Sequence, residues 1–197
     1  MINGYLESDG RVTPLPNEEE VLLRRATSGE GEAFGQLYLS HLDSIYRYIY
    51  FRVGEQADAE DLTEQVFLKA WEALPGYTSR GHPFSSWLYR IANNIVIDFW
   101  RRKKTVRLSE LDEVNTLLDT HLTPIEQLLK TETLASLADS IRRLPDEQQQ
   151  VIILRFIEGL SHTEVAHIMG KNEGACRALQ YRALAALSRL MVHEGWK

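Results

Sequence analysis

The chain has 197 residues, of which 44% are hydrophobic, and its 28 Asp or Glu outnumber its 22 Lys or Arg, giving a formal net charge of -6. This length and composition can bury a hydrophobic core and suit one or two globular domains. The acidic balance argues against nonspecific nucleic-acid binding by the chain as a whole. One cysteine, Cys176, excludes an internal disulfide and a multi-cysteine zinc site.

The N-terminal sequence MINGYLESDGRV has neither a basic lead nor an apolar run. No other segment approaches the roughly 18 uninterrupted apolar residues of a membrane span. We therefore expect a cytoplasmic protein that does not insert into a membrane.

The first part of the chain is predicted to be a helical domain over residues 17–104, behind a flexible N-terminal tail over residues 1–16. Its apolar residues recur at three and four spacing, and no segment has the alternation of a convincing strand. The expected helices cover residues 18–26, 32–52, 58–74 and a fourth stretch from Ser85 or Ser86 to about Lys104. Pro75-Gly76 ends the third helix, and a loop follows up to Pro83.

Residues 105–131 are polar, acidic and weakly periodic, and Pro124 interrupts them, so we expect a linker. Residues 132–197 return to helical periodicity and form a second, smaller helical domain. The predicted fold class is all-α, with two small helical domains joined by an acidic linker.

The stretch SHTEVAHIMGKNEGACRAL over residues 161–179 is typical of a helix-turn-helix. Ser161 and Asn172 are suited to cap its two helices, and Gly170 suits the left-handed turn between them. In this register Cys176 is a small core residue, and the second helix turns a partly basic face outward, which can enter a major groove. A helical hairpin with a solvated basic face stays open as an alternative. His162 and His167 do not share a helical face, so no metal site is expected.

The segment RGHPFSSWLYRIANNIVIDFWRRKK over residues 80–104 combines aromatic rings with a basic end. Helical spacing places Arg90, Asn94 and Arg101 on one stripe away from the buried side. Arginine pairs with phosphates, asparagine reads base edges, and rings stack on unpaired bases, so this stripe suits DNA. A solvated helix end is the alternative, and Phe84 and Trp87 suit the core better than base contact.

Four stretches, in the family's order, resemble a bacterial extracytoplasmic-function (ECF) sigma factor of RNA polymerase. They are DAEDLTEQVFLKAW at 58–71, FSSWLYRIANNIVIDFWRRKK at 84–104, LPDEQQQVIILRFIEGLSHTEVAHIMG at 144–170 and GACRALQYRALAAL at 174–187. The resemblance implies that residues 17–104 are sigma region 2, which binds core polymerase and opens the promoter -10 element. It implies that residues 132–197 are region 4, which reads the -35 element.

The resemblance also assigns site residues. Polymerase contact is implied for Asp58, Asp61, Leu62, Glu64, Gln65 and Phe67. Contact with the -10 element is implied for the loop over 76–83 and its supporting helix, with Tyr77, Arg80, His82, Arg90, Asn94, Arg101 and Arg102. The -35 element is expected to meet the outward face and start of the last helix, with Asn172, Glu173, Ala175, Arg177, Ala178, Tyr181 and Arg182.

Four positions depart from or qualify the family pattern. Members often have glutamine and then an acid where this chain has Glu64 and then Gln65, and many have arginine where it has Leu179. Asp98 matches the pattern but is expected to be structural. The acidic linker is interpreted either as a charge mimic of RNA inside polymerase or as a solvated tether.

The expected partners are core RNA polymerase and promoter DNA, and the sequence leaves open whether an anti-sigma factor binds. No cofactor is expected. The competing interpretation is a standalone helix-turn-helix regulator with a ligand-sensing N-terminal domain. An enzyme is not expected, because the sequence has no nucleophile-elbow glycines, no phosphate-cradling loop and no clustered metal ligands.

Overall fold

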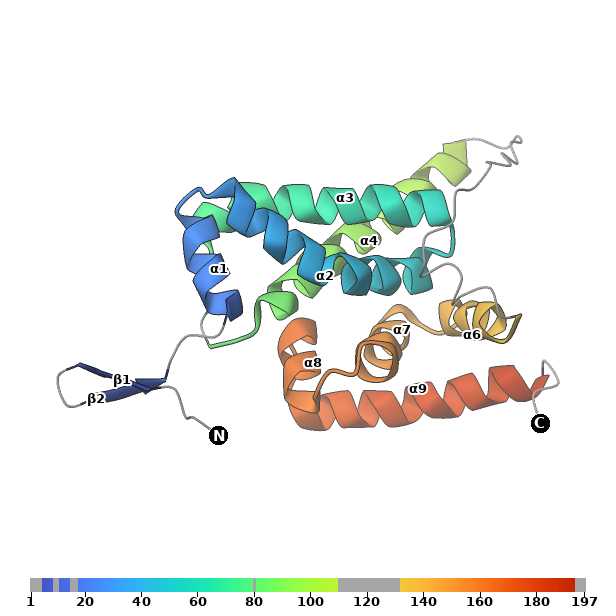
Figure 1. The fold of residues 1–197 in the computed structure, drawn as a ribbon. Helices are drawn as coiled ribbons and strands as arrows, with labels where there is room; N and C mark the ends of the chain where they lie inside the picture. Colours follow the sequence, from blue (N-terminus) through green and yellow to red (C-terminus); the bar gives the residue numbers. More distant parts are fainter. Residues whose placement is uncertain (1–4, 9–10, 15–17, 80, 110–131, 194–197) are drawn as a thin grey trace.

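The computed structural model describes residues 5–8, 11–14, 18–79, 81–109 and 132–193, and Figure 1 shows their course. Apart from a short N-terminal hairpin, the elements of this described part are helical, as predicted. Arg80 and most of the predicted linker, residues 110–131, lie outside it. In the described residues, no helix combines the length and the apolar character that crossing a membrane requires.

The hairpin corrects the expectation that the N-terminus contains no strand. Strands β1 (Tyr5–Ser8) and β2 (Arg11–Pro14) pair antiparallel, with Tyr5 opposite Pro14 and Ser8 opposite Arg11. The sequence between the strands is Asp9-Gly10, a dipeptide favoured in hairpin turns. The Asp-Gly dipeptide could have indicated the hairpin from the sequence. The short strands around it lack a strong apolar alternation, so periodicity did not reveal them.

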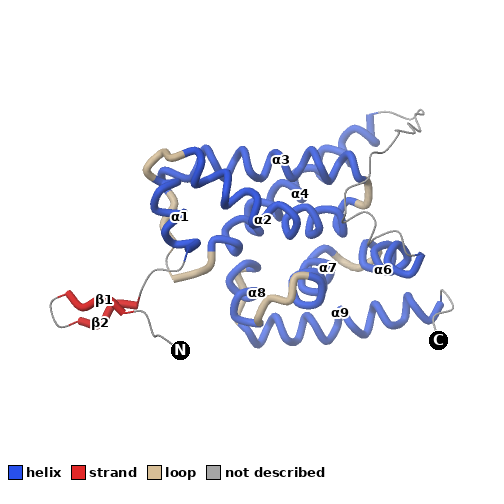
Figure 2. The backbone as a smooth tube through the Cα atoms, in the orientation of Figure 1, coloured by secondary structure: helices blue, strands red, loops and turns tan. Residues whose placement is uncertain are grey.

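The first domain surrounds one long central helix, α2. Its elements are α1 (Glu18–Thr27), α2 (Gly31–Val53), α3 (Gln56–Ala73), the 3-10 turn η1 (Leu74–Gly76) and α4 (Phe84–Ser109). Helix α2 packs against α1, α3 and α4, and Figure 2 shows α3 on its far side from the second domain, whereas α4 begins near α8 and crosses behind α2. Helix α4 continues five residues beyond the expected end at Lys104.

The second domain consists of α6 (Glu132–Arg142), α7 (Asp146–Ile152), the π-helical turn η2 (Ile153–Ile157), α8 (His162–Met169) and α9 (Glu173–His193). The predicted helix-turn-helix is formed by α8 and α9. Ser161 and Glu164 cap α8 reciprocally, and Gly170 adopts the left-handed conformation with φ 63°. The Oδ1 atom of Asn172 accepts a hydrogen bond from the backbone N–H of Ala175 at 2.8 Å. These features confirm the predicted caps and turn.

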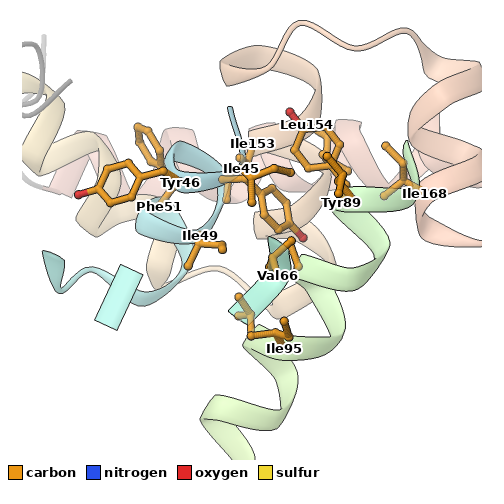
Figure 3. Packing of buried hydrophobic residues seen from close by; sticks show 14 of the residues in the cluster. Ile45, Tyr46, Ile49, Phe51, Val66, Tyr89, Ile95, Ile153, Leu154 and Ile168 are labelled. Carbon is orange, nitrogen blue, oxygen red and sulfur yellow. The ribbon is translucent and has the colours of Figure 1, made fainter. Parts of the chain in front are cut away.

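The two domains pack against each other. Helix α2 lies against α6 and η2, and α4 lies against α8. Figure 3 shows Ile45 and Tyr89 of the first domain close to Ile153 and Leu154 of the second, within one continuous hydrophobic cluster. The sequence predicted two domains joined by a linker and gave no sign of this interface.

Candidate functional site

Helix α3 separates its acidic face from its buried face. Asp61, Glu64 and Gln65 are exposed, and Asp58 is half-buried with its carboxylate 3.2 Å from the Lys103 ammonium. These four residues, called the acidic face below, match the sequence prediction of a charged outer surface. Their spacing of three and four residues keeps them on one side of the helix.

Leu62 and Phe67 were also assigned to the polymerase contact, but both are buried. They follow Ala59 and Thr63 on the inner side of α3, and the Phe67 ring packs edge-on against Tyr38 with 4.7 Å between centroids. In this conformation they support the acidic face from beneath and do not reach its surface. Helical periodicity turns these two positions inward, and their direct contact with polymerase stays a prediction.

An apolar groove of about 490 Å³ continues the acidic face of α3. Phe34 and Trp71 form one wall, with 4.9 Å between ring centroids, and Leu68 is exposed beside them. Glu64 lines both the groove and the acidic face. The sequence analysis assigns neither Trp71 nor Leu68 to a site, although an apolar residue such as Leu68 on the outer side of an acidic helix was a usable signal.

A second hollow, of about 590 Å³, lies where the loop after η1 meets the start of α4, and we call it the loop hollow. It is lined by Ala73, Gly76, Tyr77, Thr78, Ser79, His82, Pro83, Trp87, Arg90 and His167. The Tyr77 and Trp87 rings are 4.7 Å apart between centroids and form an aromatic wall. Burial, and secondarily the charge of Glu19, raise the pKa of the Tyr77 hydroxyl, so this group stays a neutral hydrogen-bond donor at pH 7.

The loop hollow unites three of the predicted -10 residues, Tyr77, His82 and Arg90. Phe84 is buried beneath it, as predicted, whereas Trp87 is half-buried and faces the hollow as well as the core. The loop reaches this shape with Gly81 at φ 77°, a conformation that a side chain would strain.

Further along α4, Asn94, Arg101 and Arg102 are exposed on the DNA-suited stripe. Asn94 borders a shallow hollow together with Trp87, and Arg101 is 3.2 Å from the Asp98 carboxylate. This ion pair agrees with the structural role expected of Asp98. Arg101 lies about two turns beyond Asn94 on the same side of the helix, and Arg102 lies about 80° further around the axis, so Asn94 and Arg101 share one solvent-facing stripe that Arg102 flanks.

The outer face of α9 is exposed at Arg177, Ala178, Tyr181 and Arg182, and Tyr181 is 77% exposed. Cys176 and Leu179 are buried on the opposite face. The predicted register of the second helix is therefore confirmed.

Two other predicted -35 residues have partners within the protein. Asn172 uses its oxygen to cap α9, and Glu173 accepts hydrogen bonds from Thr163 at 2.7 Å and from Arg177 at 3.3 Å. Glu173 thus holds the guanidinium of Arg177 at the start of the helix. Lys171, which stands where such motifs often carry an apolar residue, is 2.8 Å from Glu147 of α7.

Metal ligation is not indicated in the part of the chain that the structure describes, where no three His, Cys, Asp or Glu side chains gather closely enough to hold an ion. His162 instead pairs with Gln180 at 3.1 Å. His167 stacks on His82 with 3.3 Å between ring centroids. Burial, and then the neighbouring His82 and Arg90, lower the pKa of His167 below its ordinary value.

Comparison with known proteins agrees with this arrangement. The family model for sigma-70 region 2 matches residues 37–106, and the model for sigma-70 region 4 matches residues 134–187. The region 2 match runs from α2 into α4, and the region 4 match runs from α6 into α9, so each match falls within one helical domain. These matches define the class of protein: a sigma factor that contains sigma-70 regions 2 and 4.

Similarity to individual proteins shows which kind of sigma factor the chain is. The ECF RNA polymerase sigma factor BldN of Streptomyces coelicolor is 43% identical over 173 residues, which are 86% of this chain and 64% of BldN, so the chain spans under two thirds of that relative. The RNA polymerase sigma factor YlaC of Bacillus subtilis is 30% identical over 81% of this chain and 92% of its own length. The solved structure of CnrH in complex with the cytosolic domain of CnrY has a TM-score of 0.67 at 28% identity and covers 88% of this chain and 96% of its own. The chain belongs to the ECF family of RNA polymerase sigma factors.

Proposed function

We propose that this sigma factor binds core RNA polymerase through the acidic face of α3, captures the unpaired -10 element in the loop hollow and reads the -35 element with α9. One observation carries the proposal. The same chain has a hollow with aromatic walls and basic residues at its rim, which suits single-stranded DNA, and a helix with an exposed basic face, which suits duplex DNA.

The polymerase contact is supported by charge and shape together. Asp61 and Glu64 are exposed and belong to no ion pair that would neutralise them within the described residues. The groove of Phe34, Leu68 and Trp71 lies directly beside them and offers apolar area for a partner to bury. A partner with a basic surface and one or two apolar side chains fits this combination.

The -10 contact is supported by the contents of the loop hollow. A base that leaves the duplex loses a few kcal/mol of stacking and pairing. Stacking on Tyr77 or Trp87 returns about 1–3 kcal/mol per base, and His82 and Arg90 supply hydrogen bonds and positive charge at the rim. Asn94, Arg101 and Arg102 continue along α4 and are placed to follow the adjacent backbone.

The -35 contact is supported by the face of α9. Arg177 pairs with Glu173, and Arg182 lies five residues or about 1.4 turns further along the helix, roughly 140° around its axis, so the two arginines flank the exposed face. Such arginines pair with guanine edges or with phosphates, and Tyr181 between them adds exposed apolar area that suits a thymine methyl group. In this proposal the chain acts by binding rather than by catalysis, and it works in the cytoplasm, where polymerase and promoter DNA are found.

The experiment that tests the function is run-off transcription on genomic fragments with purified core polymerase, with and without this protein. The sigma-factor proposal predicts discrete transcripts that require both components. A standalone regulator would instead bind its operator without core polymerase in a gel-shift assay and would give no transcript start of its own. The same fragments, tested in both assays, therefore separate the two functions and identify the promoter sequence.

A further inference from the structure

The start of α9 is joined to α8 by a carboxylate that bridges the two helices. The Oε1 atom of Glu173 accepts a hydrogen bond from the Thr163 hydroxyl of α8 at 2.7 Å, and its Oε2 atom accepts one from Arg177 at 3.3 Å. Each oxygen of the carboxylate therefore has its own partner. Thr163 precedes Glu173 by 10 residues, so this bridge depends on the folded helix-turn-helix and not on α9 alone.

Two other polar contacts hold the helices of this motif in place. The Asn172 side chain caps α9 by accepting a hydrogen bond from the backbone N–H of Ala175 at 2.8 Å. Further along α9, Gln180 pairs with His162 of α8 at 3.1 Å. The backbone that carries Glu173 is thus fixed on both sides, which makes its carboxylate a rigid anchor for a neighbouring side chain.

Arg177 is the side chain that such an anchor can order. It is 64% exposed, and Glu173 is 45% exposed. A solvated arginine samples many rotamers and loses this freedom when it binds, whereas a guanidinium already held by a hydrogen bond loses less. The contact with Glu173 uses the terminal nitrogen Nη2 and leaves Nη1 and Nε to donate to DNA.

Glu173 also changes the charge that a duplex meets at this point. A free guanidinium is attracted to every phosphate of the backbone, and this attraction carries no sequence information. A carboxylate at 3.3 Å offsets that charge and repels phosphates. A guanine edge, in contrast, offers the neutral acceptors O6 and N7, which match the arginine fork. The pair with Glu173 therefore favours contact with a base over contact with a phosphate.

We propose that Glu173 is a positioning residue: anchored by Thr163, its carboxylate holds the guanidinium of Arg177 toward a guanine edge of the -35 element. Glu173 contacts no base itself, because both of its oxygens are engaged by Thr163 and Arg177. The base specificity of α9 at this position thus depends on a residue of α8. The inference rests on the proposed role of α9 in reading the -35 element.

The test measures promoter affinity of the holoenzyme reconstituted from core polymerase and the full-length chain. The probes are fluorescent duplexes of a promoter identified by run-off transcription, one natural and the others with each -35 base pair substituted in turn. The specificity ratio is the Kd on a substituted duplex divided by the Kd on the natural one. We expect Arg177→Ala to flatten this ratio at one G·C pair, which identifies the base pair that Arg177 reads.

The variants of the bridge separate position from charge. Glu173→Ala should lower the specificity ratio at the same base pair by about fivefold, a large part of what a bidentate arginine contributes. It should also steepen the loss of affinity with salt, since the freed guanidinium can neutralise a phosphate. Thr163→Val removes the anchoring hydroxyl and keeps the charge pair, so it should lower the ratio without changing the salt dependence. In an Arg177→Ala background, Glu173→Ala should not change the ratio further.

Asp139→Ala is the matched control. Asp139 is an exposed acid of α6 that pairs with Arg143 at i,i+4 spacing and 3.2 Å, as Glu173 pairs with Arg177. Helix α6 lies at the other end of α9 from α8, as Figure 1 shows. This variant should keep the wild-type ratio and salt dependence, and circular dichroism checks that every variant is folded.

Several results would overturn the proposal. An unchanged ratio in Glu173→Ala would show that Arg177 is oriented without the carboxylate. A Glu173→Ala effect that persists in the Arg177→Ala background would make Glu173 a direct base contact, for example to cytosine N4. Equal weakening on all duplexes, in either single variant, would mark a phosphate contact or a merely structural role. A wild-type holoenzyme that is indifferent to every -35 substitution would instead remove the proposed role of α9, and the positioning role with it.

Discussion

Asp146→Ala is predicted to loosen the interface between the domains without unfolding either one. Removing one partner of a buried ion pair costs about 3–5 kcal/mol, but the Asp146 side chain is 54% exposed, so water already screens part of the interaction. Asp146, the first residue of α7, pairs with the fully buried Arg52 of α2. We expect its removal to cost the packing of the two domains about 2 kcal/mol, which is roughly a thirtyfold change in the ratio of packed to separated domains. The buried Arg52 makes the loss larger than a surface pair would give.

The assay is urea titration followed in parallel by circular dichroism and by energy transfer between dyes on cysteines introduced at the exposed Ser40 of α2 and Ser188 of α9. In the wild type the two signals should be lost together, because the domains share one hydrophobic cluster. In Asp146→Ala the energy transfer should be lost at lower urea, before the helical signal changes. Glu147→Ala is the matched control, since Glu147 pairs with Lys171 inside the second domain and is 58% exposed. An Asp146→Ala protein whose two transitions coincide with those of the wild type would refute the reasoning.

Three further predictions concern the other surfaces. Reversal of Asp61 and Glu64 to lysine should abolish co-elution with core polymerase on gel filtration while circular dichroism stays unchanged; unaltered co-elution would move the contact elsewhere. Arg177→Ala should weaken -35 duplex binding by about 1–3 kcal/mol and relax specificity at one position if it reads a base, whereas an equal loss on all sequences would mark a phosphate contact. Because the packing of the two domains lowers the pKa of His167, separated domains take up the proton first as pH falls below the ordinary histidine value of about 6.5. The domains should therefore be packed most strongly above that pH and less below it, seen as falling energy transfer, and a His167→Gln variant should lack this step.

Local patterns predicted the parts of the site that a single helix determines. The outer face of α9, the cap at Ser161 and the left-handed Gly170 all follow from residues within one or two turns of one another. The same periodicity separates the exposed Asp61 from the buried Leu62. The family resemblance assigns Asp61 and Leu62 to the same polymerase contact, although helical periodicity turns Leu62 inward.

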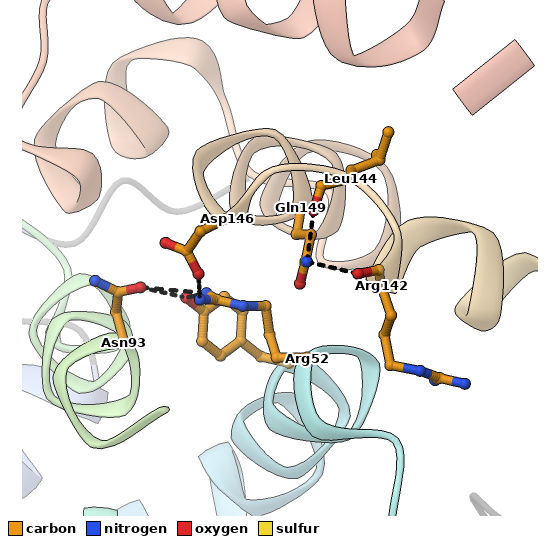
Figure 4. A network of polar contacts seen from close by, with 7 residues as sticks. Arg52, Asn93, Arg142, Leu144, Asp146 and Gln149 are labelled. Carbon is orange, nitrogen blue, oxygen red and sulfur yellow. Dashed lines mark hydrogen bonds and ion pairs between the residues drawn. The ribbon is translucent and has the colours of Figure 1, made fainter. Parts of the chain in front are cut away.

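Local sequence patterns could not predict the interface between the domains. Arg47 and Glu158 are 111 residues apart, and Arg52 and Asp146 are 94 apart, so no periodicity links them. An arginine and an acid on amphipathic helices both look like surface residues in the sequence. Only the packing of α2 against η2 and the start of α7 brings these partners together, as Figure 4 shows for Arg52 and Asp146. Only the placement of α8 shows that His167 reaches the loop hollow.

The capture of the -10 strand by the loop hollow is tested most directly by permanganate footprinting of thymines on a promoter bound by the reconstituted holoenzyme. Wild-type protein should make thymines near the start site reactive. A variant in which residues 76–83 are replaced by a glycine-serine segment of equal length should keep binding to core and to the closed promoter but lose this reactivity, and a pre-melted template should partly restore its transcription. Normal reactivity with the replaced loop on duplex DNA would contradict the account.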